Sequence, residues 1–207
     1  MEPDKPVIAP APVSTASADE PSRTTSRAAF RRRAWLTLLL VSLAVLGLDQ
    51  ASKRWADQAL RLAPQRRMAL VDNYLHLNYV RNPGAAWGFL ARSPENFRHP
   101  FFVVISLAAI AFIVFIHARL EPGQGLLLAA ISLVMGGALG NFLDRIRLRY
   151  VIDFIEIHWK HRYHWPTFNV ADIAITVGVA LLVLEMLFGP WWRRRRNRSA
   201  AGGTATT

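Results

Sequence analysis

Four long apolar runs dominate the chain, separated by two polar loops and one short turn. They predict transmembrane helices over residues 34–54, 100–117, 125–143 and 170–188. Each run approaches the roughly 20 residues that a helix needs to cross a bilayer. An N-terminal signal peptide is the alternative for the first run. We reject it because the leader is too long, and because the polar stretch from Asp49 to Lys53 stands where a small-residue cleavage site would be needed.

The loops between the runs contain two segments with the pattern of β-strands. Residues 70–80 are rich in β-forming residues and partly alternate, and Asn82-Pro83-Gly84 closes them like a turn. Residues 151–157 alternate as well, which places Asp153 on a strand-like segment at the membrane surface. The expected fold class is therefore an all-α membrane protein, with four transmembrane helices and a small sheet over their outer ends.

Positive charge is concentrated beside the apolar runs. The 207 residues are 52% hydrophobic and carry a net charge of +11, with arginine clusters at residues 31–33 and 193–198. Such flanking clusters indicate cytoplasmic anchoring next to anionic lipid. We therefore expect membrane lipid as a partner and no nucleic acid, both termini in the cytoplasm, and loops 49–99 and 144–169 outside. These loops hold eight and five Lys or Arg residues, so the positive-inside bias is incomplete.

The composition also predicts the domain organisation. Residues 1–30 are rich in Pro, Ala, Ser and Thr and are expected to form a disordered cytoplasmic tail, followed by one four-span domain over residues 31–192. Residues 193–207 are expected to be a basic, disordered cytoplasmic tail. The chain has no cysteine, which excludes thiol catalysis, disulfides, thiolate zinc sites and acylation of this chain itself on cysteine.

Two aspartates, Asp153 and Asp172, lie within strongly apolar stretches, where a carboxylate is costly. Asp172 alone is explained by a helix start, with Asn169 as cap and the acid in the first turn. Asp153 alone could be an exposed position on an amphipathic strand. Together, two acids at the outer ends of neighbouring segments can converge on one water molecule, and apolar surroundings would raise the pKa of Asp153. The pair therefore indicates an intramembrane aspartyl peptidase.

Further polar residues lie at the outer ends of the first and third runs. Gly136, Gly137 and Gly140 predict close packing against another helix. The three polar residues that follow, Asn141, Asp144 and Arg145, share one helical face. We expect Asp144 and Arg145 to pair structurally, and Asn141 to touch substrate.

Three weaker patterns have simple structural explanations. Asp49 and Lys53 can form an intrahelical ion pair worth a few tenths of a kcal/mol. Ser52 and Lys53 are adjacent, and adjacent helical residues point about 100° apart, which disfavours a Ser–Lys hydrolase. The histidines at positions 158, 161 and 164 could bind a metal, but an aromatic and basic interface belt explains them better.

Five short segments carry most of these polar residues. They are Asp49-Gln50-x-Ser52-Lys53, Asn82-Pro83-Gly84-Ala85-Ala86-Trp87-Gly88, Gly136-Gly137-Ala138-Leu139-Gly140-Asn141-x-x-Asp144-Arg145, Val151-x-Asp153-Phe154 and Phe168-Asn169-x-Ala171-Asp172. In this order, over roughly residues 34–190, they resemble the motifs of lipoprotein signal peptidase, the type II signal peptidase of bacteria.

The resemblance implies a multi-pass inner-membrane aspartyl endopeptidase with four helices and an outer, periplasmic β-cradle. It would remove the signal peptide of diacylglyceryl-modified prolipoproteins just before the lipidated cysteine. By motif position, Asp153 and Asp172 correspond to the catalytic dyad. The expected substrate-binding residues are Asn82, Asn141 and Arg145, and the expected supporting residues are Asp49, Lys53, Gly84, Asp144 and Asn169.

The same resemblance implies inhibition by globomycin-type cyclic peptides, an active site near the outer membrane face, no metal and no organic cofactor. We expect a monomer. In the expected mechanism, one ionised aspartate activates water while the protonated one donates to the developing oxyanion. Two other classes stay open. A proton-coupled transporter would keep intramembrane acids but would be expected to show repeated or broken helices, and a membrane scaffold would leave the two acids unexplained.

Overall fold

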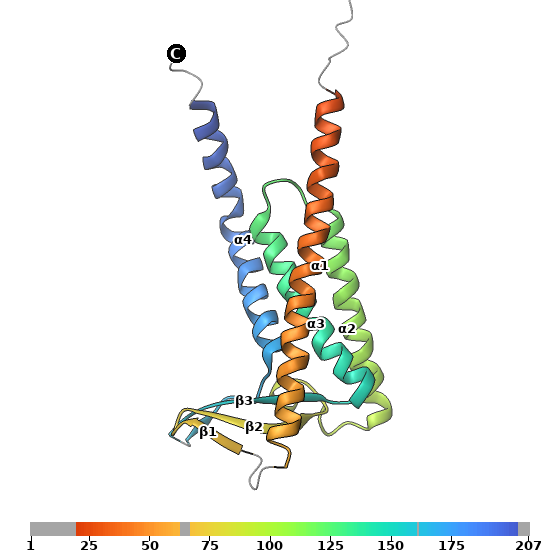
Figure 1. The fold of residues 1–207 in the computed structure, drawn as a ribbon, viewed down its shortest axis with the longest axis vertical. Helices are drawn as coiled ribbons and strands as arrows, with labels where there is room; N and C mark the ends of the chain where they lie inside the picture. The colour runs from red at the N-terminus through yellow and green to blue at the C-terminus, as the bar shows by residue number, and fades with distance from the viewer. Residues whose placement is uncertain (1–19, 63–66, 161, 203–207) are drawn as a thin grey trace, which may run out of the picture.

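Four long helices and a small sheet make up the protein in the computed structural model, which describes residues 20–62, 67–160 and 162–202. The helices are α1 (Glu20–Ala59), α2 (Glu95–Ala118), α3 (Gly125–Leu148) and α4 (Val170–Gly202). Each is long and apolar enough to cross a membrane. The prediction of four spans is thus confirmed, and the sheet lies across one end of the helical bundle (Figure 1).

Helices α1 and α4 both continue into the regions expected to be disordered tails. The first helix already begins at Glu20, and the last runs to Gly202, while residues 1–19 and 203–207 lie outside the described part of the chain. Arginine and alanine are good helix formers, so a helix can propagate through these segments once the apolar run has nucleated it. The two extensions lie at the end of the bundle away from the sheet (Figure 1).

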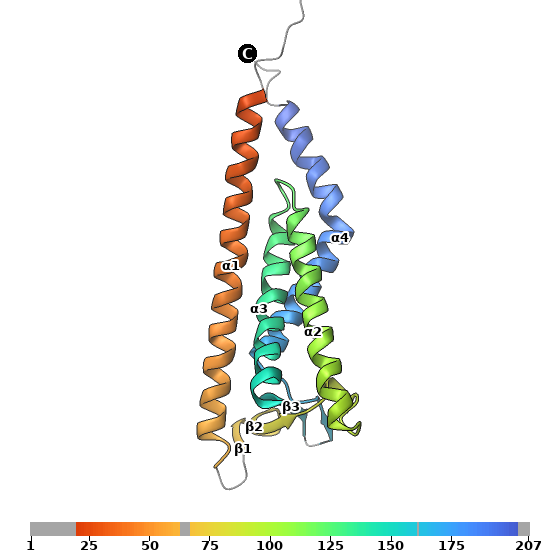
Figure 2. The same cartoon turned by 90° about the vertical axis from the view of Figure 1, so that its right-hand side faces the viewer.

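Helix α3 is the centre of the bundle. Half of the residues in its most apolar stretch are buried, whereas 28% or less are buried in the corresponding stretch of each of the other three helices. It packs against α1, α2 and α4, and its central position is visible in the rotated view (Figure 2). The outer faces of the other helices expose leucine, valine, isoleucine and phenylalanine side chains, as lipid-facing surfaces do.

Glycines allow the neighbouring helices to approach α3 closely. A Cβ atom at Gly136 would lie 2.9 Å from the carbonyl oxygen of Ser42 on α1, and one at Gly137 would collide with the carbonyl oxygen of Ala171 on α4. Gly178 plays the same part from the α4 side, where a Cβ would lie 2.8 Å from the carbonyl oxygen of Ala130. The predicted role of the glycines in helix packing is confirmed.

The sheet is antiparallel, with strands in the order β1 (Arg67–Val71), β2 (Leu75–Asn82), β3 (Val151–Trp159) and β4 (Tyr163–His164). Strands β1 and β2 form a hairpin, and most of β2 lies in the segment that the sequence predicted as a strand. Between β2 and β3, Val80 is opposite Asp153 and Asn82 is opposite Val151. This register brings the end of β2 beside the acidic residue of β3.

A hydrophobic cluster joins the sheet to the end of α1. Ala56 and Leu60 pack against Tyr79 of β2 and against Ile152 and Phe154 of β3, and all five are buried. Because successive residues of a strand point to opposite faces, Asp153 faces away from its neighbours Ile152 and Phe154. The cluster therefore fixes the strand in the orientation that aims Asp153 at the helix ends.

Candidate active site

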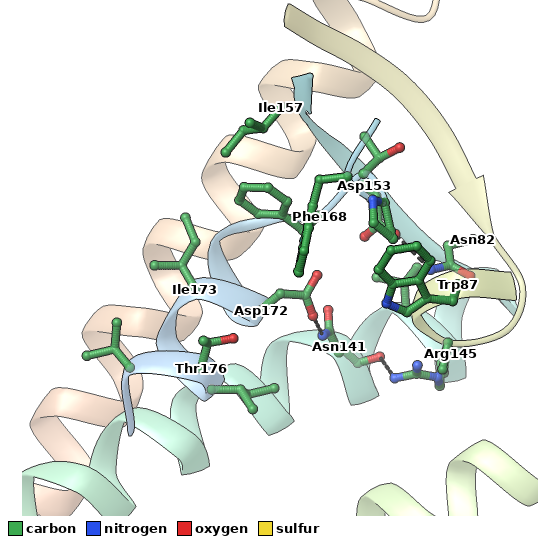
Figure 3. Close-up of a pocket in the computed structure, with 17 residues that line it drawn as sticks. Asn82, Trp87, Asn141, Arg145, Asp153, Ile157, Phe168, Asp172, Ile173 and Thr176 are labelled. Carbon is green, nitrogen blue, oxygen red and sulfur yellow. Dashed lines mark hydrogen bonds between the residues drawn. The ribbon is translucent and has the colours of Figure 1, made fainter. Parts of the chain in front are cut away.

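A cavity of about 660 Å³ lies where the sheet meets the ends of α3 and α4 (Figure 3). Polar side chains line one part of its wall. The sequence had singled out Asn82, Asn141, Arg145, Asp153 and Asp172, and the cavity is also lined by Thr167 and Thr176. Apolar side chains line the rest, including Trp87, Ile157, Phe168 and Ile173. The cavity thus combines a few convergent polar groups with an apolar wall, as small-molecule and peptide sites do.

Asp153 projects from β3 and is only 2% exposed. Its Oδ2 accepts a hydrogen bond from Asn82 Nδ2 at 2.8 Å, and its Oδ1 accepts one from Asn169 Nδ2 at 2.7 Å. Burial, followed by the negative charge of Asp172, raises the pKa of Asp153 to about 7, although both amide hydrogen bonds act in the opposite direction. The carboxyl group of Asp153 therefore keeps its proton to a much higher pH than an ordinary aspartate does.

Asp172 belongs to the first turn of α4 and forms a reciprocal cap with Asn169. Asn169 Oδ1 accepts from the Asp172 N–H at 3.0 Å, and Asp172 Oδ2 accepts from the Asn169 N–H at 3.1 Å. This is a capping-box arrangement, so the helix-start explanation of Asp172 is correct. The other oxygen, Oδ1, accepts from Asn141 Nδ2 at 2.8 Å, and Asp172 therefore also serves the cavity (Figure 3).

Asn169 connects the two acids. Its amide oxygen caps α4, while its amide nitrogen donates to Asp153. The side chain is fully buried, so neither group can turn to water. The Asn169 side chain therefore holds both the start of α4 and the carboxyl group of Asp153 on β3.

Asn82 and Asn141 are oriented in the same way: the side-chain oxygen of each accepts a hydrogen bond from a neighbouring donor. The Gly84 N–H donates to Asn82 Oδ1 at 3.0 Å, which leaves the Asn82 NH₂ group facing Asp153. Lys53 Nζ donates to Asn141 Oδ1 at 2.9 Å, which leaves the Asn141 NH₂ group facing Asp172. An amide whose oxygen is already bound has only its nitrogen to offer, so both asparagines act as hydrogen-bond donors to the acids.

A buried charge cluster lies behind Asn141. Lys53 Nζ is 2.8 Å from Asp49 Oδ2 and 3.0 Å from Asp144 Oδ2, and all three side chains are almost fully buried. Gln50 Nε2 donates to Asp144 Oδ1 at 3.0 Å, and the Ala171 N–H donates to Asp49 Oδ1 at 2.9 Å. The cluster therefore ties α1 to α3 and to the start of α4.

This cluster corrects two expectations from the sequence. The Asp49–Lys53 pair is not a surface ion pair worth a few tenths of a kcal/mol, because burial makes the loss of either partner far more costly. Asp144 pairs with Lys53 and not with its neighbour Arg145, because consecutive helical residues point in different directions. The disfavoured Ser–Lys pair is also absent among the described contacts: Ser52 Oγ donates to the Asp49 carbonyl oxygen.

Arg145 reaches from α3 towards the loop that follows β2. Its guanidinium donates to the carbonyl oxygen of Gly84 at 3.4 Å and to that of Asn141 at 3.3 Å, and it lies 5.1 Å from the ring centroid of Phe102. A Cβ atom at Gly84 would collide with the carbonyl oxygen of Phe89, so the loop folds back on itself tightly there. Arg145 thus brings a positive charge to the cavity wall.

The histidines near the sheet are engaged with other side chains. His158 Nε2 lies 3.1 Å from His76 Nδ1, and His164 Nδ1 lies 3.0 Å from Glu156 Oε1. His161 lies outside the described residues. Among the residues that are described, no group of three or more His, Asp or Glu side chains is placed to hold a metal ion.

Sequence reasoning overlooked several residues around the cavity. The rings of Trp87 and Trp165, which both line it, meet edge to face at 5.5 Å. Phe168 lies between the two acids in sequence, and Gln50 supports Asp144. The large number of aromatics in polar loops was the available signal, since exposed tryptophans often mark a binding surface. Gln50 stands in the first of the five quoted motifs, but no role was assigned to it.

Comparisons with known proteins give consistent results. The sequence model of the family described as signal peptidase (SPase) II matches residues 41–188. Lipoprotein signal peptidases of Geobacter sulfurreducens and Syntrophotalea carbinolica are 45% and 44% identical over 147 residues, which is 71% of this chain and 89% and 88% of theirs. A bacterial membrane enzyme solved by the in meso method at 1.9 Å resolution is similar with a TM-score of 0.63 and 31% identity, covering 73% of this chain and 92% of its own.

Proposed function

The chain belongs to the signal peptidase II family, and on that premise we propose that Asp153 and Asp172 are the catalytic pair with which it removes signal peptides from prolipoproteins. It is a multi-pass membrane protease of the aspartic type, which makes the transporter and scaffold alternatives unnecessary. One observation carries the assignment of the pair. Two carboxyl groups from β3 and α4 line one cavity and are bound by the same asparagine, Asn169.

The hydrogen bonds around the pair support a division of roles. Asp172 accepts from a side-chain amide and a backbone N–H, the partners that stabilise a carboxylate. Asp153 has its pKa raised to about 7 by burial and by the charge of Asp172, so it readily holds a proton. In the proposed resting state Asp172 is ionised and Asp153 is protonated.

Cleavage then follows as an acid–base reaction on the scissile peptide. Asp172 takes a proton from water, whose oxygen attacks the carbonyl carbon, while Asp153 gives its proton to the carbonyl oxygen. When the C–N bond of the tetrahedral intermediate breaks, the proton on Asp172 passes to the leaving amine and Asp153 recovers its own. Two carboxyl groups and one water molecule complete the cycle, so the proposed reaction uses neither a metal nor an organic cofactor.

The residues around the pair have proposed supporting roles. Asn82 and Asn141 orient the two carboxyl groups, since each already donates to one of them. Arg145 is the charged donor that lines the cavity, and we assign it to the substrate backbone, where a guanidinium can bind carbonyl oxygens. Lys53, Asp49 and Asp144 act through Asn141, and Gly84 acts through Asn82.

The apolar wall suits a lipid-modified substrate. Ile173 and Val177 of α4 line the cavity and are also 43% and 45% exposed, so the cavity continues onto the outer face of that helix. We propose that the acyl chains of the diacylglyceryl cysteine lie along this face in the bilayer. The scissile bond just before that cysteine then reaches the two acids.

The proposed placement in the cell follows from the charges. The arginine-flanked ends of α1 and α4 lie away from the sheet, so cytoplasmic termini put the sheet and cavity near the periplasmic face of the inner membrane. A single chain supplies every residue named above, and we propose that it acts as a monomer. Globomycin-type cyclic peptides are the proposed inhibitors, because a cavity of about 660 Å³ can hold part of a cyclic peptide.

The decisive experiment follows the substrate by mass. Purified protein in detergent is incubated with a diacylglyceryl-modified prolipoprotein, with and without globomycin. Loss of the signal peptide with the wild type, but not with Asp153→Asn or Asp172→Asn, supports the pair. Asp72→Asn is the matched control, because Asp72 is an exposed turn residue between β1 and β2. Wild-type rates in either active-site variant would refute the assignment.

A further inference from the structure

A second, smaller cavity of about 40 Å³ lies beside the C-terminal end of α2, which is the end of that helix away from the sheet (Figure 2). It is formed between α1 and the last turn of α2. The residues that line it are Phe30, Arg31, Ala34, Trp35, His117, Ala118 and Leu120. None of them belongs to the proposed catalytic machinery.

His117 is the unusual member of this cavity. Its side chain is only 4% exposed, and neither ring nitrogen has a hydrogen-bond partner among the described residues. The ring packs on Trp35, with centroids 4.0 Å apart. Because a buried polar atom without a partner is costly, the imidazole would gain from a ligand atom that enters the cavity.

The cavity wall favours an anionic ligand that accepts hydrogen bonds. Arg31 contributes a positive charge, Trp35 carries an indole N–H, and no residue that lines the cavity is acidic. An imidazole has at least one N–H in either protonation state, so His117 can donate as well. Oxygen atoms that carry negative charge match this set of donors.

The size and position of the cavity narrow the choice of ligand. A volume of about 40 Å³ exceeds the roughly 10–15 Å³ that one water molecule needs, and it admits a few oxygen atoms but no acyl chain. Arg31 stands just before the uncharged run that begins at Ala34, so the cavity lies level with lipid headgroups. An anionic group at the level of the lipid headgroups can therefore enter the cavity from the bilayer surface.

We propose that Arg31, Trp35 and His117 form a binding site for the phosphate group of an anionic ligand, supplied by a phospholipid headgroup of the leaflet opposite the sheet. Free inorganic phosphate has the same chemistry and is the other possible source. The site would anchor the ends of α1 and α2 to the membrane surface, far from the cavity that holds Asp153 and Asp172. It is independent of the proposed peptidase mechanism.

The test measures lipid binding to the full-length protein. Native mass spectrometry in detergent compares phosphatidylglycerol with zwitterionic phosphatidylcholine of the same acyl chains for the wild type, Arg31→Ala and His117→Phe. Arg32→Ala is the matched control, because it removes the same charge from an exposed neighbour that does not line the cavity. A parallel titration with inorganic phosphate distinguishes the two sources.

We expect phosphatidylglycerol to bind more tightly than phosphatidylcholine. Arg31→Ala and His117→Phe should each weaken the binding of phosphatidylglycerol about tenfold, the effect of one charge-assisted hydrogen bond, while Arg32→Ala leaves it unchanged. Competition by millimolar phosphate would identify the free ion as the ligand. Equal affinity in the wild type and Arg31→Ala, or an equal loss in Arg31→Ala and Arg32→Ala, would overturn the site. Phenylalanine keeps the ring packed on Trp35, and Arg31 is exposed, so neither variant depends on refolding of the core.

Discussion

Two groups of buried carboxyl groups lie near the sheet end of the bundle, and they differ in the charge of their hydrogen-bond partners. Asp49 and Asp144 share the ammonium group of Lys53, at 2.8 and 3.0 Å. Asp153 and Asp172 receive neutral amide donors instead, and no described residue forms a salt bridge with either. Both groups are held by hydrogen bonds, but only one of them contains a cation.

The difference separates a structural cluster from the pair of acids that we propose to be catalytic. Asp49 and Asp144 are occupied by Lys53 and by further donors from Ala171 and Gln50, and neither acid lines the cavity. Amide donors stabilise the carboxylate more weakly, and burial outweighs them at Asp153, whose pKa lies near 7. An Asp-to-Asn substitution should therefore lower the reaction rate in the pair Asp153 and Asp172, and lower the stability of the fold in the cluster around Lys53.

The largest expected effect is on the reaction rate of Asp153→Asn. Loss of a general acid lowers the rate by about 10²–10⁴-fold. The measurement is the initial rate of signal-peptide release, followed by mass spectrometry under single-turnover conditions.

Asp144→Asn provides the contrast with that variant. The Asp-to-Asn change beside Lys53 should lower the free energy of unfolding by about 1–3 kcal/mol. It should leave most of the cleavage rate intact, because Asp144 does not line the cavity. A similar loss of rate in Asp144→Asn and Asp153→Asn would contradict the proposal that only the second group is catalytic.

Lys53→Met should have the next largest effect, this time on stability. Removal of the ammonium group leaves two buried carboxyl groups without their cation, which costs about 3–5 kcal/mol. It also removes one of the two donors to Asn141 Oδ1 and leaves only Asn169 Nδ2 at 3.2 Å, so the donor to Asp172 is held less firmly. Detergent-solubilised protein is unfolded with denaturant, beside Lys160→Met as a control in an exposed turn. A stable Lys53→Met protein would show that the cluster is dispensable.

The pH dependence gives a smaller, graded effect. Asp153 must be protonated to act as the acid and has a pKa of about 7, so kcat/KM should fall about tenfold per pH unit above pH 7. Stability changes in the same direction. The folded protein holds a proton on Asp153 that the unfolded chain, with an ordinary aspartate pKa near 3.9, releases. Between about pH 4 and 7 the wild type should therefore lose stability relative to Asp153→Asn as the pH rises.

Asn82→Ala should produce the smallest change. It removes one donor to the ionised form of Asp153, so the pKa of Asp153 rises and the alkaline limb of the rate profile moves to higher pH. The expected cost in stability is about 1 kcal/mol. Asn78→Ala, on the same strand but outside the cavity, is the control, and an identical shift there would contradict the role of Asn82.

Local patterns predicted much of the fold. Run length predicted the four helices, and alternation with a closing turn predicted strands β2 and β3, because these signals depend on neighbours in the chain. Asp153 and Asp172 were found as costly acids in apolar surroundings, whereas Asn82 was named from the family resemblance alone, and the structure brings these three residues to one cavity.

Partner choice could not be predicted in the same way. Asp144 was assigned to its neighbour Arg145, whereas its partner Lys53 comes from a helix about 90 residues earlier in the chain. The sequence does not reveal which faces of α1 and α3 meet, and the burial of Lys53 depends on that contact. The double use of Asn169, as cap and as donor to Asp153, likewise requires β3 and α4 to be in place.

The hydrogen bond from the Ala171 N–H to Asp49 spans 122 residues and joins the first helix to the last. Since α4 is synthesised last, Asp172 cannot reach Asp153 until all four helices have inserted and the final one has docked. Partly synthesised chains in the membrane therefore carry no assembled pair of acids. If the pair is catalytic as we propose, peptidase activity begins only once α4 has docked.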